Sequence, residues 1–262
     1  MTNVYEVLHN NTKKGGGAML KKGLVIYEPR GRAGEYAPLA VNLYKGCGHG
    51  CIYCYAPEAT FVDRQKFIKA LPRQDIIKKL AKDAPQAALD SYKGNVLLCF
   101  VTDPYQPIDI TYQLTRQAIE ILHENLFNVI ILTKGGKRAE RDFDLLRPGD
   151  EFATTLTFLD EQKSLQWEPW AAIPGERMET LRKAYKLGVK TWVSLEPVIE
   201  PAESLEIIKQ THTFVDLFKV GKLNYHPRAD EIDWRKFLRE CIATLKQYGC
   251  QYYIKRDLRR YN

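Results

Sequence analysis

The sequence predicts an α/β protein built as a partial (β/α)6-type TIM barrel with an extended N-terminal arm. From residue 39 onward, short apolar runs alternate with segments of helical period, which is typical of βαβ units around a parallel sheet. The stretch EPRGRAGEY at residues 28–36 and the run Gly15-Gly16-Gly17 instead indicate turns and extended chain. A length of 262 residues suits one α/β barrel domain. We therefore expect an arm over residues 1–38 and a barrel domain over 39–262.

Seven short apolar runs are the expected strands of this sheet. They cover Leu39–Tyr44, Val96–Val101, Val129–Thr133, Phe152–Thr157, Thr191–Leu195, Phe214–Val220 and Gln251–Ile254. A doubly wound sheet with the same alternation is the competing arrangement, because both folds are built from strand–helix units.

The expected helices lie between these runs. In Leu114–Glu124, the side chains of Leu114, Ala118 and Leu122 fall on one face at helical spacing. The other expected helices are Arg177–Leu187, Ala202–Gln210 and Trp234–Gln247. Gly188 and Gly249 follow two of them, where a left-handed residue commonly closes a helix.

Composition and charge restrict the class of protein. The longest apolar run, Val96–Val101, is far too short to span a bilayer, so no membrane partner is expected. The N-terminus lacks the apolar segment of a secretory signal, which predicts a cytoplasmic protein. A net charge of +7 favours anionic partners such as nucleic acid. The denser basic patches, which a solvated face explains equally well, contain Lys13, Lys14, Lys21, Lys22, Lys255, Arg256, Arg259 and Arg260.

Three of the six cysteines occupy the eight residues Cys47-Gly-His-Gly-Cys51-Ile-Tyr-Cys54, directly after the first expected strand. This C-x3-C-x2-C spacing places three soft thiolates in one short loop, and such ligands select zinc or an iron–sulfur cluster. Zinc needs a fourth ligand in a closed site. His49 lies inside the loop, but no second Cys or His pair follows. A cubane cluster held by three cysteines leaves one iron open for a substrate.

The ends of the strands supply the remaining candidate site residues, since active sites of barrels gather at the carboxyl ends of their strands. These candidates are the Cys47 loop, Thr102, Asp103, Lys134, the segment Thr155–Thr157, Glu196 and Lys219. Polar residues are common wherever loops begin, so each one alone is weak support for a function.

The cysteine loop, with Tyr53 before its last Cys, resembles the signature of the radical S-adenosylmethionine (SAM) enzymes. The wider stretch EYAPLAVNLYKGCGHGCIYCYA at 35–56 and the run TDPYQP at 102–107 are similar to the branch around spore photoproduct lyase. The resemblance implies a partial barrel of the radical SAM kind. It also implies a 4Fe-4S cluster on Cys47, Cys51 and Cys54, whose open iron binds SAM. Reductive cleavage would then give a 5'-deoxyadenosyl radical, with chemistry that belongs largely to the cofactor.

The resemblance also implies roles for individual residues. Tyr53 matches an aromatic residue that contacts adenine, while Thr102 and Lys134 match a Ser and a Lys that contact SAM. Thr155 lies near a further Ser contact, although Thr157 is equally reachable in register. Asp103 and Glu196 join these residues as expected cofactor-binding groups. Tyr55 matches a Tyr implicated in returning a hydrogen atom, and packing under the loop is the competing explanation.

One position departs from the lyase pattern. The hydrogen-donating cysteine of the lyases lies three residues before the Asp that matches Asp103, and that position is Phe100 here. Because side chains alternate along a strand, Phe100 should face the cofactor with Thr102, and Cys99 should point toward the helices. We therefore expect the chain to lack the donor thiol and not to perform ordinary thymine-dimer repair.

The resemblance implies a photoproduct lyase-like radical SAM enzyme, and the basic charge favours a nucleic acid or nucleotide as the source of the hydrogen, with DNA repair or modification as the expected role. The enzyme class further implies an electron donor such as a flavodoxin or ferredoxin. Two alternatives stay open. One is a non-catalytic nucleic-acid-binding protein with a structural zinc site, and the other is a radical SAM enzyme acting on a protein or a small metabolite.

Overall fold

The computed structural model describes residues 24–89 and 94–262. The triple-glycine run and the predicted basic residues Lys13, Lys14, Lys21 and Lys22 therefore lie outside the described residues.

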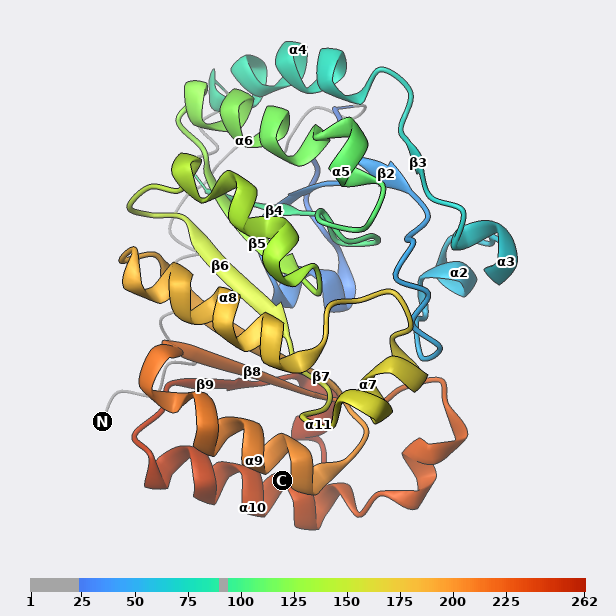
Figure 1. Ribbon diagram of the computed structural model, residues 1–262, viewed down its shortest axis with the longest axis vertical. Helices are drawn as coiled ribbons and strands as arrows, with labels where there is room; N and C mark the ends of the chain where they lie inside the picture. Colours follow the sequence, from blue (N-terminus) through green and yellow to red (C-terminus); the bar gives the residue numbers. More distant parts are fainter. Residues whose placement is uncertain (1–23, 90–93) are drawn as a thin grey trace.

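One parallel sheet of seven strands forms the centre of the molecule (Figure 1). Its strands are β1 (Leu39–Val41), β4 (Asn95–Leu98), β5 (Asn128–Thr133), β6 (Glu151–Thr155), β7 (Lys190–Val198), β8 (Leu217–Lys222) and β9 (Tyr252–Ile254). They lie side by side in chain order, without a reversal. A doubly wound sheet would reverse its order in the middle, so that alternative is wrong. Within residues 24–89 and 94–262 the sheet ends at β1 and β9 without closing, which confirms the prediction of a partial barrel.

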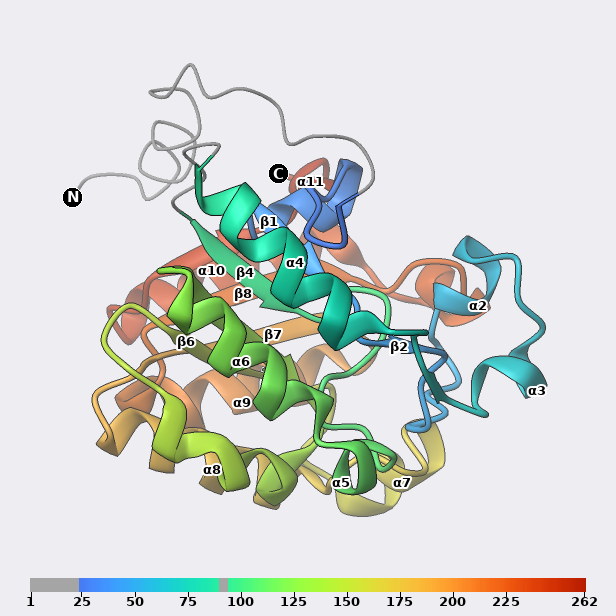
Figure 2. The same ribbon diagram turned by 90° about the horizontal axis from the view of Figure 1, so that it is seen from above.

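Helices connect the strands and cover the outer face of the sheet, as two perpendicular views show (Figures 1 and 2). The longer ones are α4 (Ile76–Leu89), α6 (Leu114–Glu124), α8 (Pro174–Lys186), α9 (Pro201–Thr211) and α10 (Trp234–Gln247). The shorter helices are α2 (Ala56–Ala59), α3 (Arg64–Phe67), α5 (Asp109–Tyr112), α7 (Glu161–Trp167) and α11 (Arg256–Arg259). The 3-10 helices are η1 (Gly31–Glu35), η2 (Gly136–Leu145), η3 (His212–Phe214) and η4 (Pro227–Glu231).

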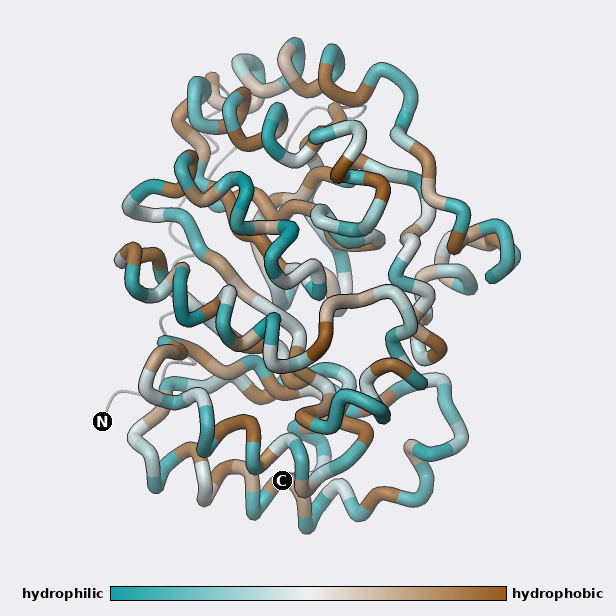
Figure 3. Tube along the Cα trace, in the orientation of Figure 1, coloured by the Kyte–Doolittle hydropathy of each residue, from teal (hydrophilic) through white to brown (hydrophobic). Residues whose placement is uncertain are grey.

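Alternation along the strands separates two apolar layers. Val96 and Leu98 of β4 pack in the large core under the helices, whereas Leu97 joins a smaller cluster on the inner face. Ile130, Ala153 and Trp192 from the next strands belong to that inner cluster as well. The apolar residues concentrate along the strands (Figure 3). Burial of these side chains, worth about 1.5–3 kcal/mol each, is the main term that stabilises the sheet against its helices.

The N-terminal segment of the described chain packs on the inner face. Tyr27 forms an isolated antiparallel bridge with Ala40. Beyond η1, Ala37 is buried in the inner cluster, and Tyr36 packs against it. The division into an arm and a barrel domain stays a prediction, but residues 27–37 contribute directly to the barrel interior.

Several element boundaries differ from the prediction. The first expected strand ends at Val41, and Tyr44-Lys45 instead forms β2, which pairs antiparallel with β3 (Leu71–Pro72). Helix α4 was not among the expected helices, although Ile76, Leu80 and Ala84 are buried on one side of it. Strand β8 covers Leu217–Lys222 and not the expected Phe214–Val220, and residues 212–214 form η3. Lys219, expected near the end of this strand, lies inside it.

Within the described residues, no helix is both long and apolar enough to cross a membrane. Cys241 is buried in α10 with the outer core, as expected of an apolar thiol, and Cys250 is partly buried.

Candidate active site

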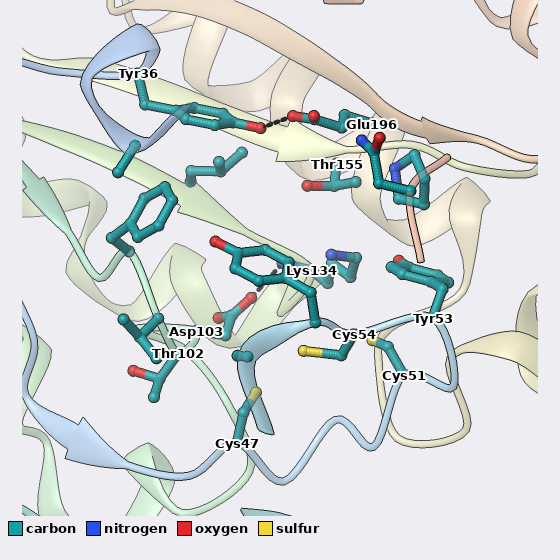
Figure 4. Close-up of a pocket in the computed structure, with 18 of the residues that line it drawn as sticks. Tyr36, Cys47, Cys51, Tyr53, Cys54, Thr102, Asp103, Lys134, Thr155 and Glu196 are labelled. Atoms are coloured by element: carbon teal, nitrogen blue, oxygen red, sulfur yellow. Dashed lines mark hydrogen bonds between the residues drawn. The ribbon is translucent and has the colours of Figure 1, made fainter. Parts of the chain in front are cut away.

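A cavity of about 440 Å³ opens at the carboxyl ends of the strands (Figure 4). The predicted site residues that line it are Cys47, Cys51, Tyr53, Cys54, Tyr55, Thr102, Asp103, Lys134, Thr155 and Glu196. Thr157 and Lys219 do not line it. The three cysteines lie at one end of the cavity, and Tyr36 and Glu196 lie at the other end (Figure 4).

The cysteine loop begins at a glycine that the geometry requires. Gly46 has a φ of +75°, and a Cβ atom there would lie 2.2 Å from the carbonyl oxygen of Phe67. The same carbonyl accepts a hydrogen bond of 2.9 Å from the backbone N–H of Cys47. A larger residue at position 46 would therefore push α3 away from the first cysteine.

Two side chains from outside the loop hold its backbone. The Gln106 Oε1 atom accepts a hydrogen bond of 2.7 Å from the N–H of Gly48. The guanidinium of Arg64 in α3 donates to the carbonyl oxygens of Cys51 and Cys54, at 3.2 and 2.7 Å. Neither residue was predicted, because their partners become neighbours only once the loop folds back on itself.

His49 lines the same cavity as the thiols, and both of its ring nitrogens contact residues outside the cysteine loop. Its Nδ1 atom is 3.4 Å from Asp103 Oδ2, and its Nε2 atom is 2.9 Å from Arg138 Nη2. Burial lowers the pKa of His49 to about 4, which favours the neutral ring. The imidazole therefore connects the cysteine loop to Asp103 and Arg138.

Asp103 connects the cysteine loop to the strand that carries Lys134. Its Oδ1 atom accepts hydrogen bonds from Thr133 Oγ1 at 2.6 Å and from the N–H of Tyr105 at 2.8 Å. Its Oδ2 atom accepts from the N–H of Lys134 at 2.7 Å. Although Asp103 lines the cavity, both oxygens are occupied by protein donors, so its contacts position neighbouring residues.

The three thiols suit a cluster better than a single ion. Among residues 24–89 and 94–262, no group of three His, Cys, Asp or Glu side chains converges closely enough to hold one metal ion. A cubane spreads its thiolates over separate iron atoms, so it needs them further apart than zinc does. Burial raises the pKa of Cys51 to about 12. Because the ligand must be deprotonated, binding at this loop releases protons.

A buried acid–base pair under Tyr53 was missed by the sequence analysis. Glu168 and Arg177 form an ion pair of 2.5 Å in which both side chains are almost completely buried. The hydroxyls of Tyr53 and Thr157 donate to Glu168 Oε1, the second at 3.3 Å. This contact fixes the ring of Tyr53 at the cavity wall and takes the Thr157 hydroxyl away from it. Of the two predicted threonines, Thr155 therefore faces the cavity and Thr157 does not.

Two polar groups face the cavity beside the cysteines. The Lys134 Nζ atom lies 5.6 Å from the centre of the Tyr53 ring. Burial opposes its charge, but Cys51 and Glu168 outweigh burial and raise the pKa of Lys134. Thr102 Oγ1 is buried and makes no hydrogen bond of standard geometry to any described residue. The Thr102 hydroxyl acts on the Cys99 thiol, where it opposes the rise of the pKa that burial causes. Because a thiol is a weak hydrogen-bonding partner, this hydroxyl stays a candidate for a polar ligand group.

Strand β4 ends at Leu98, so simple alternation does not govern residues 99–102. Phe100 packs against the inner cluster, and Cys99 packs in the outer core, as predicted. The Cys99 sulfur accepts a hydrogen bond of 3.4 Å from the N–H of Leu43. Atoms of Cys99 nevertheless also line the cavity, which the expectation of a thiol directed only toward the helices did not include.

The far end of the cavity contains a second group of polar residues. Lys255 Nζ forms an ion pair with Glu196 and lies 3.2 Å from the centre of the Tyr36 ring. The Tyr36 hydroxyl also donates to Glu196. Lys255 was expected in an exposed basic patch, but it is buried because its backbone N–H donates to Val220 of β8 and turns the side chain inward.

Comparisons with known proteins complete the description of the site. The family model of the radical SAM superfamily matches residues 41–215, which is more than half of the chain. The chain belongs to the radical SAM superfamily. Membership implies a 4Fe-4S cluster and SAM, and the three thiols and the Lys134 cation, which line one cavity, fit these groups.

Solved structures agree with the fold of this radical SAM protein. A spore photoproduct lyase mutant with bound AdoMet and dinucleoside spore photoproduct matches with a TM-score of 0.68 and 12% identity, over 90% of this chain and 80% of the lyase. SuiB of Streptococcus suis bound to S-adenosylmethionine matches with a TM-score of 0.61 and 12% identity, over 82% of this chain and 46% of SuiB.

Two relatives are similar in sequence. An uncharacterized protein of Methanocaldococcus jannaschii is 26% identical over 80% of this chain and 87% of its own length. An uncharacterized protein of the Acidianus two-tailed virus is 26% identical over 73% of this chain and 67% of its own length. Neither name indicates a substrate.

Proposed function

We propose that this radical SAM protein takes a hydrogen atom from a nucleic acid or nucleotide substrate, with chemistry similar to that of photoproduct lyases, in DNA repair or modification. The observation that carries the proposal is one cavity lined by three cysteine thiols, by Lys134 and by Thr102. When bound, the cluster and SAM supply a 5'-deoxyadenosyl radical after one-electron reduction.

The protein residues at the cysteine end bind and orient the cofactor. Lys134 would pair with the carboxylate of SAM, since a charge-assisted hydrogen bond in a buried place is among the strongest available. The hydroxyls of Thr102 and Thr155 would form hydrogen bonds with the polar groups of SAM, either as donors or as acceptors. Tyr53, held by Glu168, offers its ring face to a planar group.

Tyr55 is the proposed catalytic residue. It follows the third cysteine, lines the cavity, and exposes 43% of its surface. A phenol in this place can give its O–H hydrogen atom to a substrate radical. The phenoxyl radical left on Tyr55 would then take one electron from the electron donor and one proton from water. Cys99 also reaches the cavity but packs mainly in the core, so we do not assign the donor role to it.

The net positive charge of the chain supports an anionic substrate and an acidic electron donor, such as a flavodoxin or ferredoxin. The cavity itself is also lined by the cationic side chains of Arg30 and Lys222. A nucleic acid would make affinity fall steeply with salt, because phosphate contacts release counterions.

The test of the substrate class uses the cluster-loaded protein, SAM and a chemical reductant. We expect a single-stranded oligonucleotide to bind with a steep salt dependence and to increase the formation of 5'-deoxyadenosine. If the oligonucleotide does not change the rate of 5'-deoxyadenosine formation, and its binding does not depend on salt, the substrate is instead a protein or a metabolite.

The same protein distinguishes the roles of Tyr55 and Cys99. Tyr55→Phe should preserve SAM cleavage but slow product formation on the substrate, whereas Cys99→Ala should leave product formation intact. Loss of turnover of a dinucleotide photoproduct in Cys99→Ala, with SAM cleavage retained, would show that Cys99 is the donor after all.

A further inference from the structure

The carboxylate of Glu196 has an uneven set of partners. Tyr36 Oη and Lys255 Nζ both approach the same oxygen, Oε2. The other oxygen, Oε1, makes no hydrogen bond to any residue in the described part of the chain. About a fifth of the Glu196 side chain is accessible, and the residue lines the cavity. One oxygen is therefore held by the protein, and the other is available as an acceptor.

The backbone of β8 fixes the position of this carboxylate. A Cβ atom at Gly221 would lie 2.7 Å from Glu196 Oε1 and equally close to its carboxyl carbon. The glycine therefore lets the carboxyl group rest against the strand. With Lys255 and Tyr36 on Oε2 and β8 behind it, Glu196 is held in one orientation before any ligand binds.

The cavity wall between this carboxylate and the cysteines suits a flat, largely apolar group. Leu97, Phe100 and Leu132 line it with apolar surface. Two tyrosines, Tyr55 and Tyr225, also line the cavity and are exposed to 43% and 80%. Exposed aromatic rings at such a site stack on planar rings, which is how proteins commonly bind single nucleobases.

We propose that Glu196 Oε1 accepts a hydrogen bond from a ring N–H at the edge of a planar heterocycle in the substrate, of the nucleobase class. This inference rests on the function proposed above and assigns Glu196 to the substrate, whereas its place at a strand end predicted a cofactor contact. Tyr36 and Lys255 are positioning residues, because they act through Glu196.

The polarity of the site explains why an N–H is the group recognised. A carboxylate accepts and cannot donate, so a ring nitrogen without hydrogen would leave Oε1 unpaired. Burial, followed by the charge of Glu196, raises the pKa of Tyr36 far above its ordinary value, so its hydroxyl keeps donating. Sites built to form a hydrogen bond discriminate strongly against analogues that lack the partner.

Two matched ligand pairs test the proposal directly: uridine with 3-methyluridine, and guanosine with 1-methylguanosine. Each methylated analogue replaces the ring N–H and keeps the aromatic surface. Binding to the cluster-loaded protein with SAM would be followed anaerobically by calorimetry. We expect at least one unmodified nucleoside to bind about tenfold or more tightly than its methylated partner.

The variant Glu196→Gln inverts the polarity of the site while keeping its shape. Because Tyr36 and Lys255 both donate to the Oε2 position, the Gln carbonyl must face them, and its NH2 group then takes the place of Oε1. The preference for the N–H nucleoside should disappear or reverse. Tyr36→Phe keeps Lys255 on the carboxylate and should retain the preference. Glu231→Gln, on the exposed helix η4, is the matched control.

Three results would overturn the proposal. They are no preference for the N–H ligand in the unmodified protein, an unchanged preference in Glu196→Gln, and a Glu196→Gln variant whose only defect is weaker SAM binding. The last would assign Glu196 to the cofactor. A protein that fails to produce 5'-deoxyadenosine at all would instead contradict the proposed function, so the two failures are distinguishable.

Discussion

Two glutamates near the cavity have similar partners but differ in burial and in how many of their carboxylate oxygens bind protein donors. Glu168 and Glu196 each receive a tyrosine hydroxyl and pair with a cation, Arg177 in one case and Lys255 in the other. Glu168 is completely buried and uses both oxygens for protein donors. Glu196 is partly accessible and uses only one oxygen. A carboxylate with both oxygens satisfied supports a site, whereas one with a free acceptor facing a cavity can bind a ligand.

The largest expected effect is a difference in the free energy of unfolding between variants of these two glutamates. Glu168→Gln leaves the guanidinium of Arg177 buried without its counter-charge, and we expect the free energy of unfolding to fall by about 3–5 kcal/mol. Glu196→Gln should cost less, about 1 kcal/mol, because burial already lowers the pKa of Lys255 and its amine can lose the proton, whereas the Arg177 guanidinium cannot. Urea unfolding of both variants, monitored by circular dichroism, measures the difference. Equal losses would remove the distinction between a supporting and a binding carboxylate.

The next prediction concerns affinity at the cysteine end. Lys134→Met removes the cation that faces the cavity, and the Kd for SAM should rise about 10- to 100-fold, as expected for a charged hydrogen bond of about 1.5–3 kcal/mol. Preference among nucleosides should change little. Lys183→Met on the outer face of α8 is the control. Equilibrium dialysis with labelled SAM gives both constants, and an unchanged Kd for Lys134→Met would remove Lys134 from the cofactor site.

A pH-dependent effect is expected behind the far end of the cavity. Lys219 is buried, donates to the Tyr36 carbonyl, and lies 4.2 Å from the centre of the Trp192 ring system. Burial lowers its pKa to about 7, so from pH 7 to about 10 the unfolded chain holds a proton that the folded chain has lost. Stability from this group therefore rises with pH across that window, by at most about 1.4 kcal/mol per pH unit.

Lys219→Met tests this directly. The variant should be more stable than the parent protein below pH 7, and its advantage should shrink as the pH rises toward 10. Thermal unfolding of both proteins at one-unit steps measures the trend. A constant difference between the two proteins across the whole range would show that Lys219 keeps its ordinary pKa.

The smallest expected effect is that of Thr102→Val. The Thr102 hydroxyl has no hydrogen-bond partner of standard geometry in the described protein. Its removal should therefore not lower stability, but it should weaken SAM binding about fivefold, as for one neutral hydrogen bond of about 1 kcal/mol. Loss of stability without loss of affinity would mean that the hydroxyl serves the fold.

The sequence was informative wherever one segment determines its own structure. The cysteine loop and helices 114–124 and 234–247 follow from local spacing, and the parallel order of the strands follows from their alternation with helices. Glu168 and Arg177 could not be paired, because nothing in their local sequence shows that both will be buried beside Tyr53. Tyr36 was placed in an extended arm, and its insertion into the barrel depends on contacts with Trp192 and Phe100 far along the chain.

Strand register is the second feature that the sequence alone does not determine. A shift of two residues keeps a side chain on the same face of a strand, so Thr155 and Thr157 were equivalent in sequence. The hydrogen bond of Thr157 to Glu168 distinguishes them in the folded protein. The expected strand Phe214–Val220 and the observed strand β8, Leu217–Lys222, also differ at both ends, so Lys219 lies inside the strand and not at its carboxyl end.

The central claim is that the three cysteines hold a cluster that cleaves SAM. Its most direct test is formation of 5'-deoxyadenosine by anaerobically reconstituted, chemically reduced protein, compared with Cys51→Ala prepared in parallel. We predict a brown protein that forms 5'-deoxyadenosine from SAM, and a Cys51→Ala variant that has lost this activity at least 100-fold, about 2.7 kcal/mol or more. A colourless zinc protein that forms none would contradict the account and favour a nucleic-acid-binding module.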